Sequence, residues 1–265
     1  MTYLSFILIF VLPPTLIALV LAFIRFDQLP KGAIGSAVAL IVLALVYTIP
    51  WDRHLILTGV WGYPEDRVLG TFLAIPVEEL SFIILQAFGV SAWTLYLTRI
   101  LPIDTQIPSA YSERLAFERA RWFGIGAALQ IFLFGILFLQ IDATRYLGLL
   151  LSWVGPVLLL QCSVGGALLW KLRQIWLLSI LPPFLYLCLV DRIAIGFGIW
   201  YFSPEYTSGI RLLGLPLEEA LFFFLTCTMV SQGVLLYTGL LRNWSDQPET
   251  APRWIRSLIL RRSNP

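Results

Sequence analysis

The sequence predicts an all-α polytopic membrane protein, with seven transmembrane helices arranged as two parallel three-helix repeats joined by a linker helix. Composition, a series of long apolar segments and an internal repeat carry this prediction. Of the 265 residues, 58% are hydrophobic and 13% are charged, and the mean hydropathy is +0.83. Soluble domains have about 25% charged residues, so we expect this chain to fold in a lipid bilayer. Its net charge of +2 is too small to indicate nucleic-acid binding.

The apolar segments define the predicted helices. A helix needs about 20 residues to cross the hydrocarbon core. Segments of suitable length lie at residues 3–24, 33–51, 71–98, 122–141, 146–170, 174–190 and 212–241. Residues 99–121 predict a loop and a short amphipathic start to the fourth helix. The basic tail after Leu241 predicts a segment that is disordered or lies on the membrane surface.

The distribution of basic residues predicts the orientation. Most of the 18 Lys and Arg residues fall in segments on the side of the carboxyl terminus. Cytoplasmic loops carry an excess of Lys and Arg, so we expect a cytoplasmic carboxyl terminus, an amino terminus outside, and insertion in the cell (inner) membrane.

Two stretches of the chain repeat the same polar landmarks. Trp51–Glu79 aligns with Val190–Glu219: an Asp-Arg pair, a Trp, a Pro-Glu and a final Pro-x-Glu-Glu recur in the same order. Each repeat holds three helices, an odd number, so two directly fused copies would point in opposite directions across the membrane. The extra fourth helix gives the second copy the same orientation as the first. The halves are therefore expected to be related by an axis along the membrane normal. The predicted organisation is 1–98, first repeat; 99–141, loop and connecting helix; 142–241, second repeat; 242–265, basic tail.

The Pro-x-Glu-Glu motifs supply the candidate catalytic residues. Pro is favoured in the first turn of a helix, so the Glu residues are expected in the early turns of the third and seventh helices. There, acidic side chains could simply stabilise the helix dipole, by about 0.3–1 kcal/mol each. Their repetition in apolar sequence favours function instead, and a Glu that keeps its proton in such surroundings is a Brønsted acid. The candidates are Glu78, Glu79, Glu218 and Glu219.

Polar and aromatic residues near these motifs are candidates for supporting roles. Asp52 and Asp191 each precede an Arg at the end of a span, which is typical of an interface ion pair or a helix-end anchor. The aromatic residues would fit an interfacial belt or a pocket that stabilises a cation through ring faces. These aromatic candidates are Trp51, Trp61, Tyr63, Trp200, Tyr201 and Phe202.

The remaining patterns predict no cofactor and no metal. The sequence has no G-x-G-x-x-G, no Cys or His cluster and no Asp-rich magnesium motif. Proton transfer within lipid is the chemistry that is left. An alternative reading of duplicated intramembrane carboxylates is a small transporter or proton pathway, which would show ion- or proton-coupled flux.

The repeated segments resemble the flavin-free integral-membrane lycopene cyclases, which occur as two small subunits or one fused chain. The residues that carry the resemblance are TIPWDRHLILTGVWGYPEDRVLGTFLAIPVEELSF at 48–82 and DRIAIGFGIWYFSPEYTSGIRLLGLPLEEALFFFLT at 191–226. The resemblance implies a carotenoid-biosynthesis enzyme, an isomerase or intramolecular lyase, that closes rings at the ψ-ends of lycopene. It implies β-rings, giving γ- and/or β-carotene, with the paired Glu residues as the functional ones. The expected partners are lipid-soluble lycopene, membrane lipids and other carotenoid-pathway enzymes.

Overall fold

The computed structural model describes residues 1–24, 33–101 and 111–246. Within these ranges, seven helical segments are long and apolar enough to cross a membrane, as the sequence predicts. The first span is built from α1 (Tyr3–Phe6), a π-helical turn (Ile7–Val11) and α2 (Leu12–Phe23). The others are α3 (Ala33–Leu57), α4 (Val77–Ile100), α5 (Tyr111–Phe138), α6 (Arg145–Lys171), α7 (Arg173–Gly196) and α8 (Leu217–Asp246).

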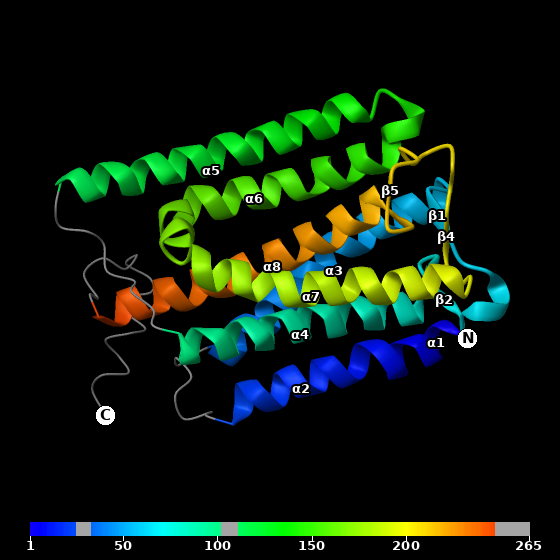
Figure 1. Ribbon diagram of the computed structural model, residues 1–265, viewed down its shortest axis with the longest axis horizontal. Helices are drawn as coiled ribbons and strands as arrows, with labels where there is room; N and C mark the ends of the chain where they lie inside the picture. Colours follow the sequence, from blue (N-terminus) through cyan, green and yellow to red (C-terminus); the bar gives the residue numbers. More distant parts are fainter. Residues whose placement is uncertain (25–32, 102–110, 247–265) are drawn as a thin grey trace.

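The helices form an elongated bundle with α5 along one edge and α2 along the opposite edge (Figure 1). α5 packs on α6, α2 packs on α4, and α8 contacts α3, α4, α6 and α7. Within the apolar, 18-residue part of each span, 67% of the residues of α8 are buried but only 11% of those of α5. α8 is therefore the central helix, and the outer helices present apolar side chains to the surroundings, as expected in lipid.

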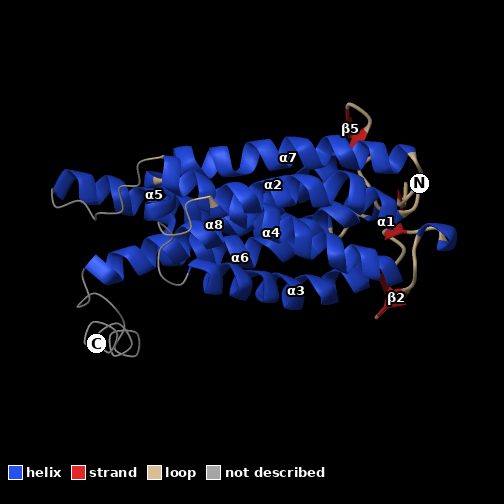
Figure 2. Ribbon diagram, turned by 90° about the horizontal axis from the view of Figure 1, so that it is seen from below, coloured by secondary structure: helices blue, strands red, loops and turns tan. Residues whose placement is uncertain are grey.

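Short strands gather at the end of the bundle where α4 and α8 begin (Figures 1 and 2). β2 (Thr71–Phe72) pairs with β3 (Ile75–Pro76), and β5 (Arg211–Leu212) pairs with β6 (Leu215–Pro216), each as a hairpin directly before its helix. The two-residue turns have positive φ at both positions, as the strand twist requires. These hairpins fix where the two Pro-x-Glu-Glu motifs enter their helices.

A third strand pair joins the two halves of the chain. β1 (Trp61–Gly62) pairs antiparallel with β4 (Tyr201–Phe202), with Gly62 opposite Tyr201. The Tyr201 ring lies against Gly62, where an added Cβ would come within 2.6 Å of the phenol oxygen. The lack of a side chain at Gly62 therefore permits this close contact.

The structure corrects several predicted boundaries. The third and seventh spans begin at Val77 and Leu217 rather than at 71 and 212, because the preceding residues pair as hairpins. The second and sixth continue to Leu57 and Gly196, past the positions where Asp52 and Asp191 suggested an end. α8 reaches Asp246, so the first residues of the predicted tail are helical. The rest of that tail, and most of the predicted loop within 99–121, lie outside the described residues.

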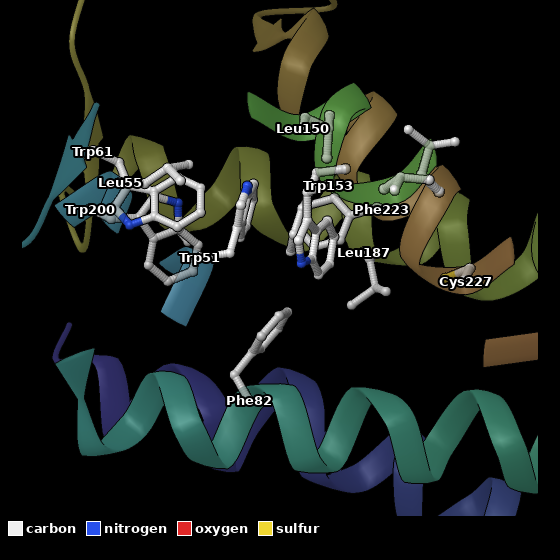
Figure 3. Packing of buried hydrophobic residues seen from close by; sticks show 14 of the residues in the cluster. Trp51, Leu55, Trp61, Phe82, Leu150, Trp153, Leu187, Trp200, Phe223 and Cys227 are labelled. Carbon is white, nitrogen blue, oxygen red and sulfur yellow. The ribbon is translucent and has the colours of Figure 1, made fainter. Parts of the chain in front are cut away.

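An aromatic cluster fills the core near the hairpins (Figure 3). The Trp51 ring stacks on Trp153 with centroids 4.5 Å apart, and it lies parallel to Phe222 at 6.0 Å. Phe82 points from α4 toward this cluster (Figure 3). These rings form a rigid apolar wall beside the starts of α4 and α8.

Candidate acid site

The four Glu residues of the repeated motifs divide into two kinds. Consecutive helical residues diverge by about 100°, so the members of a pair face different surroundings. Glu79 and Glu219, the second of each pair, line a small space of about 40 Å³ together with Asp191. We call this space the acid cavity. Its other lining residues are aromatic: Tyr3, Trp61, Tyr63, Phe82, Trp200, Phe202, Phe222 and Phe223.

Glu79 is held by two phenols. Its Oε2 accepts hydrogen bonds from the Tyr3 hydroxyl at 2.6 Å and from the Tyr63 hydroxyl at 2.8 Å. Burial, followed by the charge of Glu79, raises the pKa of Tyr63 well above its usual value. Tyr63 therefore stays protonated and acts as a donor, which fixes the Glu79 carboxyl group.

Glu219 is held in a similar way by one phenol. The Tyr146 hydroxyl donates to Glu219 Oε1, and both side chains are buried. Tyr146 lies at the start of α6, as Tyr3 lies at the start of the first span. Each of these two carboxyl groups is thus fixed by a Tyr from the first residues of another helix.

Glu78 and Glu218, the first of each pair, face the loops before the hairpins. Glu78 Oε1 accepts from the Leu69 N–H at 2.8 Å, and Glu218 Oε1 accepts from the Ser208 N–H at 2.6 Å. Both side chains are 2% exposed or less, yet neither lines the acid cavity. Their contacts hold the loop that leads into each hairpin.

Of the two roles predicted for Asp52 and Asp191, an ion pair with the following Arg or a helix-end anchor, the ion pair is not formed among the described residues. Both Asp side chains are buried, while Arg53 and Arg192 are exposed. Asp191 instead accepts a 2.9 Å hydrogen bond from Trp200 Nε1 and faces the acid cavity. Asp52 has no hydrogen-bond partner among the described residues and does not line the cavity.

The aromatic candidates take different positions. Trp61, Tyr63 and Trp200 line the acid cavity, whereas Trp51 backs its wall through Trp61 and Phe222. Trp51 also donates from Nε1 to the Leu149 carbonyl at 3.1 Å. Sequence reasoning missed two groups: Tyr3 and Tyr146, which carry no local signal, and three Phe residues of the cavity. Of the latter, Phe82 and Phe222 lie three residues after Glu79 and Glu219, on the same helix face, and could have been found. The third missed Phe is Phe223, whereas Phe202, an aromatic candidate from the sequence, does line the cavity.

The acid cavity is suited to moving a proton. Carboxyl groups that share so small a space cannot all be ionised, because like charges repel strongly there. At least one keeps its proton and can act as an acid beside a potential base, while the ring faces around them attract a cation. No group of three His, Cys, Asp or Glu side chains in the described part of the chain is arranged to hold a metal ion.

Fold and site together define an integral membrane protein with acidic groups enclosed by aromatic side chains. The sequence profile of the lycopene cyclase family matches residues 1–97 and 144–237. The chain therefore belongs to the lycopene cyclase family.

The curated relatives agree with this assignment. A lycopene beta-cyclase of Halobacterium salinarum is 39% identical over 92% of this chain and 98% of its own length. The bifunctional lycopene cyclase/phytoene synthase of Arthroderma gypseum is 36% identical over 84% of this chain, which corresponds to 39% of the fungal protein. That of Podospora anserina is 31% identical over 94% of this chain and 42% of its own length. No solved structure shows a significant match to this chain.

Proposed function

We propose that this protein cyclises the ψ-ends of lycopene in carotenoid biosynthesis by a redox-neutral, proton-initiated reaction. The observation that carries the proposal is that Glu79 and Glu219, from opposite halves of the chain, face one aromatic cavity. The printed name of the Halobacterium relative, lycopene beta-cyclase, favours β-rings, with γ- and/or β-carotene as products.

The reaction needs one acid and one base at each ψ-end. A protonated carboxyl group gives its proton to the terminal double bond, leaving a tertiary carbocation. The neighbouring double bond attacks this cation, which forms the ring bond and a new cation within the ring. A carboxylate then removes a ring proton and leaves a ring double bond. One proton is added and one is lost, so the product is an isomer of the substrate.

The hydrogen bonds suggest which carboxyl group does which step. Hydrogen bonds to a carboxylate favour its charged form, and Glu79 accepts two while Glu219 accepts one. We assign Glu219 as the acid and Glu79 as the base. Asp191 is a third carboxyl group in the same cavity. General acid–base steps typically contribute about 10²–10⁴-fold each.

The aromatic lining protects the cationic intermediates. Trp61, Trp200 and Phe82 present rings around the acidic groups, and aromatic faces stabilise cations. The same rings exclude water, which would otherwise trap the cation as an alcohol. Glu78 and Glu218 are assigned a positioning role, through their loop contacts.

We further infer that the two halves are structural repeats and that the acid cavity lies between them. The hairpins at 71–76 and 211–216 have the same register, and the loop contacts of Glu78 and Glu218 are equivalent. The repeats correspond to 1–98 and 142–241, with 99–141 as the connection.

In the cell we place the protein in the cell (inner) membrane, with the acid cavity near the non-cytoplasmic surface. Membrane lipids surround it, and other carotenoid-pathway enzymes supply its lycopene. A reporter fused after Pro265 is expected to be active only on the cytoplasmic side, and activity outside would reverse the assigned orientation.

The proposal is tested with purified protein in lipid vesicles that contain lycopene, in H₂O and in D₂O, without added flavin, nicotinamide or metal. We expect a cyclic product of the same mass as lycopene in H₂O, and one deuterium for each ring in D₂O. Intact lycopene in the presence of carboxylate-dependent ion flux would favour the transporter alternative and overturn the proposal.

A further inference from the structure

A larger apolar groove of about 260 Å³ lies between α2, α4 and α7. We call it the α2/α4/α7 groove. Its walls come from the first span (Val11, Pro14, Thr15, Ile17, Ala18, Leu21), from α4 (Gln86, Gly89, Val90, Trp93) and from α7 (Pro182, Pro183, Tyr186, Leu187).

Hydrogen bonds between helices hold this groove in shape. A Pro in a helix leaves the carbonyl four residues earlier without its usual partner. Pro14 leaves the Phe10 carbonyl without its helical partner, and this carbonyl accepts a hydrogen bond from the Tyr186 hydroxyl at 2.8 Å. Pro182 similarly leaves the Leu178 carbonyl without its helical partner, and this carbonyl accepts a hydrogen bond from Trp93 Nε1 at 3.0 Å. The first bond ties α7 to the first span and the second ties α4 to α7, so the groove is braced at two levels.

The groove offers nothing to a polar headgroup. Thr15 donates to the Val11 and Leu85 carbonyls, and the Gln86 amide donates to Thr226. Tyr186 and Trp93 are committed to the two braces. Every polar side chain of the lining thus donates within the protein, and the remaining surface is suited to a hydrocarbon.

The groove lies next to the acid cavity along two of its walls. On α4, Gln86 of the groove lies one turn after Phe82 of the cavity. On α7, Leu187 of the groove lies one turn before Asp191 of the cavity. Phe82 of the cavity and Leu187 of the groove both belong to the core cluster drawn in Figure 3.

A second apolar groove, of about 230 Å³, lies against α5, α6 and α8. None of the described residues of α5 and α6 lines the acid cavity. The second groove approaches the cavity only along α8, where Phe224 follows Phe223 of the cavity. The α2/α4/α7 groove approaches it along two helices, α4 and α7, and this favours the α2/α4/α7 groove.

We propose that the α2/α4/α7 groove holds the polyene chain of the carotenoid while its ψ-end occupies the acid cavity. This inference rests on the proposed function, because the groove continues the site at which the end of the hydrocarbon reacts. The 14 residues from Glu79 to Trp93 span about 21 Å of helix at 1.5 Å per residue, so groove and cavity together run beside an extended chain over about that length. Ile17 is 61% exposed and Pro182 is exposed, which opens the groove sideways to the lipid from which the substrate comes.

The test fills the groove without touching the acidic residues. Ile17→Trp with Leu21→Trp places two large side chains on the groove face of α2. The matched control is Leu16→Trp with Val20→Trp, at neighbouring positions that are 50% and 60% exposed and do not line the groove. All variants carry Glu79→Gln and Glu219→Gln, so that carotenoid binding is measured without turnover. Lycopene retained by the purified protein is read from its absorbance per protein.

We expect the groove-filling variant to retain about tenfold less lycopene than the control. Equal retention would overturn the groove proposal, even if the wild-type protein cyclises lycopene. The groove proposal would also be overturned if the groove-filling variant retained lycopene but lost a co-purifying phospholipid, measured by mass spectrometry. That result would make the groove a lipid site. Loss of lycopene in the groove-filling variant, with retention in the control, supports the groove proposal even if the wild-type protein makes no cyclic product. Absence of a cyclic product would refute only the proposed function. The single Ile17→Trp variant, at an exposed position, serves if the double variant does not fold.

Discussion

At the scale of residues, the repeated Glu pairs combine two tasks in adjacent positions. The second Glu of each pair faces the acid cavity, and the first binds a backbone N–H of the preceding loop. The sequence predicts both carboxylates at a helix start, but it could not assign these tasks. The assignment depends on how the hairpin orients the first helical turn, and on partners such as Tyr3 that lie 76 residues away.

Because Glu78 contacts the loop and does not line the acid cavity, we expect cyclisation to tolerate a neutral substitution at this position. Glu78→Gln keeps an oxygen that can accept the Leu69 N–H, so cyclisation should stay within about threefold of the wild-type rate. Glu78→Ala removes that acceptor, and an unpaired buried group costs about 1–3 kcal/mol, so its unfolding midpoint should fall. The rate of ring formation and thermal unfolding in detergent measure the two effects. A loss of about 10²-fold in Glu78→Gln, the size expected for one acid–base group, would instead assign Glu78 to the chemistry.

At the scale of elements, the hairpins before α4 and α8 differ in one turn residue. Ala74 and Gly214 occupy equivalent positions with φ of 70° and 88°. Such backbone angles suit Gly and strain other residues. The apolar segments were predicted to begin at 71 and 212, because the apolar residues of the hairpins resemble those of the spans that follow them. The Pro of each motif, by contrast, predicted a helix start, and the helices do begin directly after Pro76 and Pro216.

Exchanging these two residues should shift stability in opposite directions. Ala74→Gly relieves the left-handed strain and should raise the free energy of unfolding by up to about 1 kcal/mol. Gly214→Ala introduces the strain, and its Cβ would come within 2.6 Å of Arg192 Nε, so stability should fall by about 1 kcal/mol or more. Both are read as shifts of the unfolding midpoint in detergent. Shifts of the same sign would mean that the hairpins do not have equivalent turns.

At the scale of the whole molecule, the positions and lengths of the apolar segments were enough to predict seven apolar helices, since the bilayer requires long apolar segments. The repeat predicted two Glu pairs at the same end of the molecule, and both pairs begin helices beside the hairpins. What it could not predict is that Glu79 and Glu219 share one cavity. That depends on the β1–β4 pairing and on the packing of α4 against α8, which are contacts between distant parts of the chain.

The shared cavity is the central claim, and single substitutions test it most directly. If Glu79 and Glu219 serve as base and acid for the same ring closure, neither half can form a ring alone. Lycopene-accumulating cells that express Glu79→Gln or Glu219→Gln should then contain lycopene with at least about 10²-fold less cyclic product than wild type, with the one-ring product reduced as strongly as the two-ring product. Immunoblotting of the membrane fraction controls for insertion of each variant. Accumulation of the one-ring product at near wild-type rates in both single variants would contradict this account, because it would mean that each half carries its own complete acid site.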